Sequence, residues 1–199
     1  YIDHFQGGEL DESMYYNAGT SVFLTMGLMA LPAGTYQHAD TFLRDHAKYL
    51  PFSVTPDRKQ YVQWGDDQNP RDFTARLFKK MTDWMVTQGV TRDASLQELI
   101  TSVVTQCGAR GYLRAEPWGR AFLFYDPYAP VGAVAYGRHV STGRGHLYTK
   151  TPTTTVFLVA SNKTFEDHEW HWTFNAEVYR NGEWALTMPR SYGLWPAYQ

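Results

Sequence analysis

The stretch DHEWHWTFNAEVYRNGEWAL, residues 167–186, combines two histidines and an asparagine with a strong hairpin signal. Asn181-Gly182 separates two runs of strand-forming residues, and this dipeptide favours a two-residue type I′ turn. We therefore expect strands at 173–180 and 183–187 joined by that turn. The polar side chains before the turn then lie on a strand of the hairpin, where successive side chains point to opposite faces.

Glycine-punctuated, β-branched sequence upstream of this hairpin predicts further strands at 131–140, 145–150 and 153–160. The sequence before Asp126-Pro127 has apolar residues at three- and four-residue spacing, which is typical of helices. The expected helices span residues 11–31, 36–49, 73–88 and 96–107, with a short fifth helix at 118–125, and Pro51 and Gly89 are the predicted stops of the second and third. Helices followed by strands predict an α+β fold with a helical domain at 1–127 and an antiparallel β-sheet or sandwich domain at 128–199.

Composition limits the classes of function. The 199 residues include 43% hydrophobic and 16% aromatic residues, which suffices for a buried core, and the formal net charge is -2. This charge gives no electrostatic reason to expect nucleic acid or an anionic membrane as partner. Cys107 is the sole cysteine, so an intrachain disulfide is excluded. No apolar run approaches the roughly 20 residues of a membrane span. Because the first residue is Tyr1, we expect a processed chain or a fragment.

The histidines do not form an obvious metal site. His168 and His171 are three residues apart, and on a strand this spacing directs them to opposite faces. A shared zinc would need a distant further ligand such as Asp167, His139 or His146. We therefore expect no metal and no cofactor, and a structural zinc is disfavoured. The alternative role for each histidine is an ordinary hydrogen-bonded one.

Two groups of aromatic residues are candidates for a site. Tyr15 and Tyr16 lie in the first turns of the first predicted helix, next to Glu12 and Asn17. A helical tyrosine either packs in the core or, in a special environment, acts as a base. The tryptophans either stack on sugar rings or fill the core, and they include Trp64, Trp118, Trp170, Trp172, Trp184 and Trp195.

Several motifs in order along the chain together resemble one enzyme family. Residues 11–19, DESMYYNAG, resemble the Glu-Gly-x-x-Tyr-x-x-x-Gly helix start of the heparinase II/III-like polysaccharide lyases. Residues 61–66, which end in Trp-Gly-Asp, are similar to the family's Phe-Gly-Asp, and 147–160 resemble its first central strands. The most specific match is 168–192, which is similar to the family's histidine-containing strand, its YR-x-GEW hairpin and the glycine-tyrosine loop beyond.

The resemblance implies a helical (α/α) toroid, here incomplete, packed against antiparallel sheets with a polysaccharide cleft between them. It implies β-elimination of a uronic-acid-containing glycan by a secreted or periplasmic enzyme, with Tyr15 or Tyr16 as the base and His168 assisting. An acidic polysaccharide is then the expected partner. The substrate-binding residues that this resemblance indicates are Glu12, Asn17, Trp64, Lys150, Trp170, His171, Asn175, Arg190 and Tyr192.

The sequence also departs from the family pattern. Family members commonly carry His-x-His-x-Asp in the sheet, and here Trp170 and Trp172 occupy the second and third of these positions, which disfavours the family's zinc. Helices that normally precede the position of Tyr1 are missing, so the missing N-terminal part of the same enzyme is a further expected partner.

Two alternative functions remain open. One is a glycoside hydrolase on the same toroid, which needs two carboxylates flanking the scissile bond. The carboxylates available for it are Asp11, Glu12, Asp66 and Glu169. The other is a non-catalytic glycan-binding or assembly module that keeps the aromatic residues without the chemistry.

Overall fold

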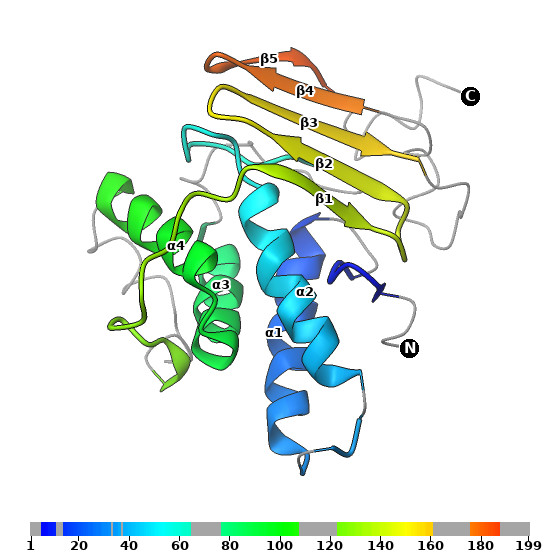
Figure 1. The fold of residues 1–199 in the computed structure, drawn as a ribbon, viewed down its shortest axis with the longest axis vertical. Coiled ribbons are helices and arrows are strands. Elements are labelled where there is room, and N and C mark those ends of the chain that lie inside the picture. Colours follow the sequence, from blue (N-terminus) through cyan, green and yellow to red (C-terminus); the bar gives the residue numbers. More distant parts are fainter. Residues whose placement is uncertain are drawn as a thin grey trace.

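The computed structural model describes residues 5–10, 14–32, 34–36, 38–64, 77–107, 123–160 and 176–187, without the side chains of 14–17, 77–79 and 107. Within these residues four helices precede one five-stranded antiparallel sheet, which confirms the predicted α+β class (Figure 1). The helices are α1 (Met14–Ala30), α2 (Ala39–Phe52), α3 (Leu77–Thr91) and α4 (Ala94–Cys107). The strands are β1 (Gly137–Ser141), β2 (His146–Lys150), β3 (Thr154–Val159), β4 (Ala176–Arg180) and β5 (Glu183–Leu186).

The sheet is an antiparallel meander in which each strand pairs with the next along the chain. Its register pairs Tyr148 with Phe157 and Phe157 with Glu177, so that these side chains share one face. Alternate residues on β2, β3 and β4 are buried, as expected for a sheet that packs against other elements on one side. Asn181 and Gly182 both have positive φ, 51° and 95°, which confirms the predicted type I′ turn between β4 and β5.

Helix α2 connects the helical part to the sheet. It contacts α3 and α4 and also β1 and β2, and Figure 1 shows its C-terminal end directed toward the sheet. There the Tyr49 ring lies 5.5 Å from the Tyr148 ring, and the Phe52 ring lies 5.7 Å from the His139 ring. A single hydrophobic cluster therefore runs from α3 and α4 through α2 to the sheet, and it includes Trp64, Trp84, Leu96, Leu99, Ile100, Tyr148 and Phe157. Burial of each large side chain contributes about 1.5–3 kcal/mol.

Two predicted helix ends were wrong. Helix α2 continues past Pro51 to Phe52, because a proline in the last turn removes only one hydrogen bond. Helix α3 continues through Gly89 to Thr91. Gly89 serves close packing instead of stopping the helix, since a Cβ atom there would lie 1.6 Å from the carbonyl oxygen of Phe124.

The strand predictions are confirmed with shorter limits. The strand predicted at 131–140 begins only at Gly137, and the expected 173–175 part of β4 lies outside the described residues. The short helix expected at 118–125 also lies mostly outside them. In the part of the chain that the structure describes, no helix has the length and apolar character needed to cross a membrane.

Candidate functional site

A pair of glycines brings the N-terminal segment between α2 and the sheet. Gly7 and Gly8 have φ angles of 95° and 78°, which favour glycine. A Cβ atom on Gly7 would lie 2.4 Å from Ser141 Cα, and one on Gly8 would lie 2.1 Å from the backbone nitrogen of His46. Only glycine fits both positions, so residues 5–10 are held between α2 and β1.

The next residue, Glu9, is a fully buried carboxylate held by β2. Its Oε1 atom accepts a hydrogen bond of 2.6 Å from the Tyr148 hydroxyl and lies 3.0 Å from His146 Nδ1. Burial alone would raise the pKa of Glu9. The charge of His146 and hydrogen bonds from His146, Tyr148 and Ser141 outweigh burial and lower that pKa. Glu9 is therefore ionised inside the protein.

Further polar and aromatic groups surround this carboxylate. The Trp64 and His146 rings lie 4.9 Å apart at 69°, and the Arg144 guanidinium lies 5.9 Å from the Trp64 ring. Together with Tyr49 and Tyr148, these residues form what we call the junction cluster: Glu9, Tyr49, Trp64, Arg144, His146 and Tyr148. They come from the N-terminal segment, α2, the segment before α3, and β2 with the turn that precedes it. The cluster thus gathers distant parts of the sequence where the helices meet the sheet.

The two tyrosines of the junction cluster are not bases. Burial, followed by the nearby charge of Glu9, raises the pKa of Tyr49 and of Tyr148 well above the ordinary value. Both phenols therefore keep their protons near neutral pH, and the Tyr148 hydroxyl donates a hydrogen bond to Glu9. A catalytic phenol, if this site uses one, must come from another element.

Among the described residues, two buried atoms of the junction cluster, Glu9 Oε2 and Trp64 Nε1, make no hydrogen bond of normal geometry. An unsatisfied buried polar group costs about 1–3 kcal/mol, and such groups are rare in native proteins. These two atoms, one acceptor and one donor, lie beside the buried pair of Glu9 and His146 and mark this cluster as the strongest candidate for a functional site among the described residues.

An open cleft lies on another side of α2. It has a volume of about 650 Å³ and runs between residues 5–7, the first half of α2, and β1 with the turn after it. Its polar lining includes His38, Asp45, Lys48 and His139. His139 Nε2 lies 2.8 Å from the Gly7 carbonyl oxygen, and burial lowers the pKa of this histidine, so it is neutral and donates to Gly7. We call this feature the α2–β1 cleft.

Two of the predicted substrate-binding residues are fully described, and both are buried. Trp64 belongs to the junction cluster and is 2% exposed. Lys150 is 1% exposed, and its Nζ atom donates to the Pro51 carbonyl oxygen at 2.8 Å. Burial lowers the pKa of Lys150 to about 7. The structure therefore brings Trp64 to the candidate site and places Lys150 between α2 and the sheet.

The other predicted residues are not described in full. Tyr15, Tyr16 and Asn17 lie in the first turn of α1, without their side chains. The predicted residues outside the described part of the chain are Glu12, His168, Trp170, His171, Asn175, Arg190 and Tyr192.

Sequence reasoning missed Glu9 and Arg144 as site residues. Glu9 follows the Gly7-Gly8 pair, and nothing in the local sequence indicates its burial, while Arg144 lies in the turn between β1 and β2. His139 and His146 were considered only as distant zinc ligands. In this structure His139 binds Gly7 and His146 pairs with Glu9. No group of three potential metal ligands occurs among the residues that the structure describes.

Comparison with known proteins adds no assignment. No protein-family model matches this chain, and a search of curated proteins found no match.

Proposed function

We propose that this chain is a polysaccharide lyase, or a part of one, that cleaves a uronic-acid-containing glycan by β-elimination. The base removes the C5 proton of the uronate, the C5–H electron pair forms the C4=C5 double bond, and the bond between C4 and the glycosidic oxygen breaks. The leaving oxygen then receives a proton. No electron acceptor is needed, so the reaction balances without a redox cofactor.

The observation that carries the proposal is the chemical make-up of the junction cluster. It contains one carboxylate, Glu9, together with the cation Arg144, the imidazole of His146 and the indole N–H of Trp64. Elimination next to a carboxylate requires positive or hydrogen-bonding groups that stabilise the charge developing on that carboxylate. A hydrolase instead requires two carboxylates flanking the scissile bond. A cluster with one carboxylate and several donors favours elimination.

The position of α1 supports a tyrosine base near this cluster. Ala18 of α1 and Tyr49 of the junction cluster line the same small cavity. By helical spacing, position 15 belongs to the stripe of Ala18 and Val22, which are buried, whereas position 16 belongs to the stripe of Phe23, which is 67% exposed. We therefore assign the base to Tyr15 in preference to Tyr16. The resemblance to the heparinase II/III-like lyases independently puts the base at one of these two positions.

The test uses a panel of uronic-acid polysaccharides and the absorbance of the conjugated C4=C5 product. Wild-type protein should release unsaturated oligosaccharides. Tyr15→Phe should lower kcat by about 10² or more, because general-base catalysis contributes about 10²–10⁴. Tyr16→Phe is the matched control and should retain activity within a few-fold. New reducing ends without absorbance would instead indicate hydrolysis, and equal small effects of both variants would exclude a tyrosine base on α1.

The α2–β1 cleft favours one alternative, a glycan-binding module without turnover. Among its lining residues, Gln6, Thr41, Asp45 and Thr142 offer partners for sugar hydroxyls, and Lys48 offers one for a carboxylate. Calorimetric titration with uronic-acid oligosaccharides distinguishes the two functions. Binding that is weakened by Lys48→Met, combined with no product on any glycan of the panel, would favour the binding module.

A further inference from the structure

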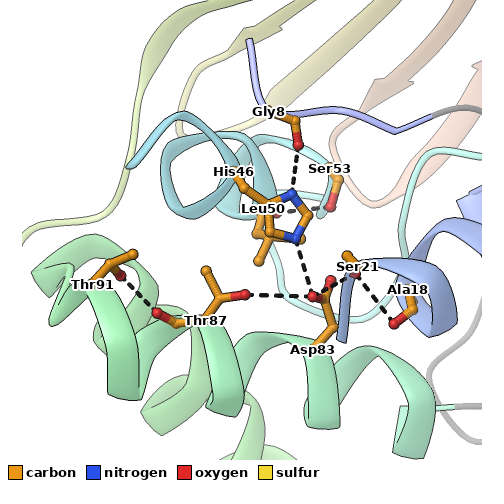
Figure 2. A network of polar contacts seen from close by, with 9 residues as sticks. All are labelled: Gly8, Ala18, Ser21, His46, Leu50, Ser53, Asp83, Thr87 and Thr91. Atoms are coloured by element: carbon orange, nitrogen blue, oxygen red, sulfur yellow. Dashed lines mark hydrogen bonds and ion pairs between the residues drawn. The ribbon is translucent and has the colours of Figure 1, made fainter. Parts of the chain in front are cut away.

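A second buried polar network fixes the N-terminal segment to the helices. Its centre is His46 of α2, which is fully buried and lies between the Gly8 carbonyl and the side chain of Asp83 on α3 (Figure 2). Nδ1 lies 2.5 Å from the Gly8 oxygen, and Nε2 lies 3.0 Å from Asp83 Oδ1. The same Oδ1 accepts a 2.6 Å hydrogen bond from Ser21 of α1 and a longer one, 3.4 Å, from Thr87. Four segments of the chain therefore meet at the His46–Asp83 pair.

Both ring nitrogens of His46 face hydrogen-bond acceptors. A backbone carbonyl oxygen can only accept, and an ionised carboxylate can also only accept. A neutral imidazole carries one N–H, so it would leave either Gly8 or Asp83 opposite a nitrogen lone pair. The imidazolium carries two N–H groups and satisfies both acceptors at once. The geometry of the site thus selects the doubly protonated ring.

The surrounding charges agree with this selection. Asp83 faces His46 from α3 and Glu9 faces it from the N-terminal segment, while the described side chains of α1 contribute the neutral hydroxyl of Ser21, which binds Asp83. From α2 itself, Phe42 stacks on the ring and Tyr49 lies 5.9 Å away. Burial alone would lower the pKa of His46, but Asp83, the Gly8 carbonyl and Glu9 together raise it. The stabilisation of the folded state by protonated His46 is complete below the ordinary histidine pKa, and it is lost as the pH rises through the raised pKa of His46.

The segment that this histidine holds is also a wall of the α2–β1 cleft. Phe5, Gln6 and Gly7 line that cleft directly before Gly8. On the other side, the His139 ring donates to Gly7, and the backbone nitrogen of Gly143 donates to the Gln6 carbonyl at 3.0 Å. His139 is neutral, so it keeps its single N–H for Gly7 at alkaline pH, whereas His46 cannot keep both of its bonds.

From this geometry we infer that His46 is a proton-dependent latch: as an imidazolium it fastens Gly8 to Asp83, and its deprotonation releases residues 5–8 from α2 and loosens the wall of the α2–β1 cleft. The step is loss of one ring proton to solvent, after which one of the two hydrogen bonds is broken. The latch does not depend on the proposed lyase activity, since its effects are measured on the protein alone.

Nuclear magnetic resonance of the whole ¹⁵N-labelled chain tests this inference. Ring nitrogen shifts should show both nitrogens of His46 protonated near pH 6.5 and one deprotonated at alkaline pH. Across that transition the Gly8 amide, which donates to the Phe5 carbonyl at 2.9 Å, should lose protection from hydrogen exchange by about tenfold or more after correction for intrinsic rates. A single N–H at about pH 6.5 would overturn the inference. So would deprotonation without any change in protection of residues 5–10.

Two variants sharpen the test. Asp83→Asn removes the negative charge beside His46. The His46 ring should then deprotonate, and the Gly8 amide should lose its protection from hydrogen exchange, at a pH about one unit or more below that of the wild type. His38→Gln alters another histidine that lines the same cleft, and it should leave both transitions unchanged. Transitions of His46 and Gly8 that separate in Asp83→Asn would contradict the latch. If Asp83→Asn does not fold, the wild-type titration decides by itself.

Discussion

Replacement of Lys150 by methionine should change how stability depends on pH. Lys150 is buried between α2 and the sheet, and its Nζ atom donates a hydrogen bond to the Pro51 carbonyl. Burial and the nearby Arg58 charge lower its pKa from 10.5 to about 7, against the opposite effects of Glu98 and Asp57. Methionine keeps the apolar stem without the amine.

The sign and size of the effect follow from proton linkage. Between about pH 7 and 10.5 the unfolded chain binds a proton at Lys150 and the folded chain does not. The free energy of unfolding of the wild type should therefore gain about 1.4 kcal/mol per pH unit from this group, or ~3 kcal/mol from about pH 7.5 to about pH 9.5. Below about pH 7 both states are protonated, and the dependence ends. Lys150→Met lacks this contribution at every pH.

The assay is urea unfolding followed by tryptophan fluorescence, with linear extrapolation at both pH values. The stability of the wild type minus that of Lys150→Met should rise by ~3 kcal/mol between them, while all other titrating groups cancel in the difference. Lys59→Met, at an exposed lysine, is the matched control and should show a constant difference. If the difference in free energy of unfolding between the wild type and Lys150→Met changes by less than ~1 kcal/mol between the two pH values, the buried amine is not neutral and the reasoning is refuted.

Three other changes test the fold and the site. Gly8→Ala should lower the free energy of unfolding by more than about 3 kcal/mol, because its Cβ atom would lie 2.1 Å from the backbone of His46. Gly34→Ala, with a similar φ of 81° and nothing within 4 Å, should lower it by only about 1 kcal/mol. Equal losses for the two variants in chemical denaturation would contradict the close packing of Gly8 against α2. His168→Ala should abolish turnover with little change in melting temperature, and undiminished activity would remove this residue from the site. Treatment with a chelator should leave the melting temperature unchanged, and a large drop would reveal a structural metal.

Local patterns were sufficient to predict the elements of the fold. Asn181-Gly182 predicted a turn that requires positive φ at two successive residues, and both residues have it. Apolar spacing predicted four helices because each of them buries one face. The helix end predicted at Gly89 was wrong, because the reason for this glycine is the approach of residue 124, which is 35 positions away and leaves no local signal.

The junction cluster was less accessible to sequence reasoning for a related reason. The burial of Glu9 depends on Tyr148 and His146, more than 130 residues later, and on two glycines that admit the segment between α2 and β1. Nothing near Glu9 in the sequence distinguishes it from a surface carboxylate. Trp64 was a candidate both as one of the tryptophans and through the family resemblance, and its role in substrate binding stays a prediction.

We propose that this chain carries out β-elimination on an acidic glycan. Mass spectrometry of oligosaccharides released from a uronic-acid polysaccharide tests it most directly. Elimination predicts that every new non-reducing end is an unsaturated uronate, lighter by one water molecule than the product of hydrolysis. Saturated ends, or intact polysaccharide after prolonged incubation with the whole panel, would contradict the claim.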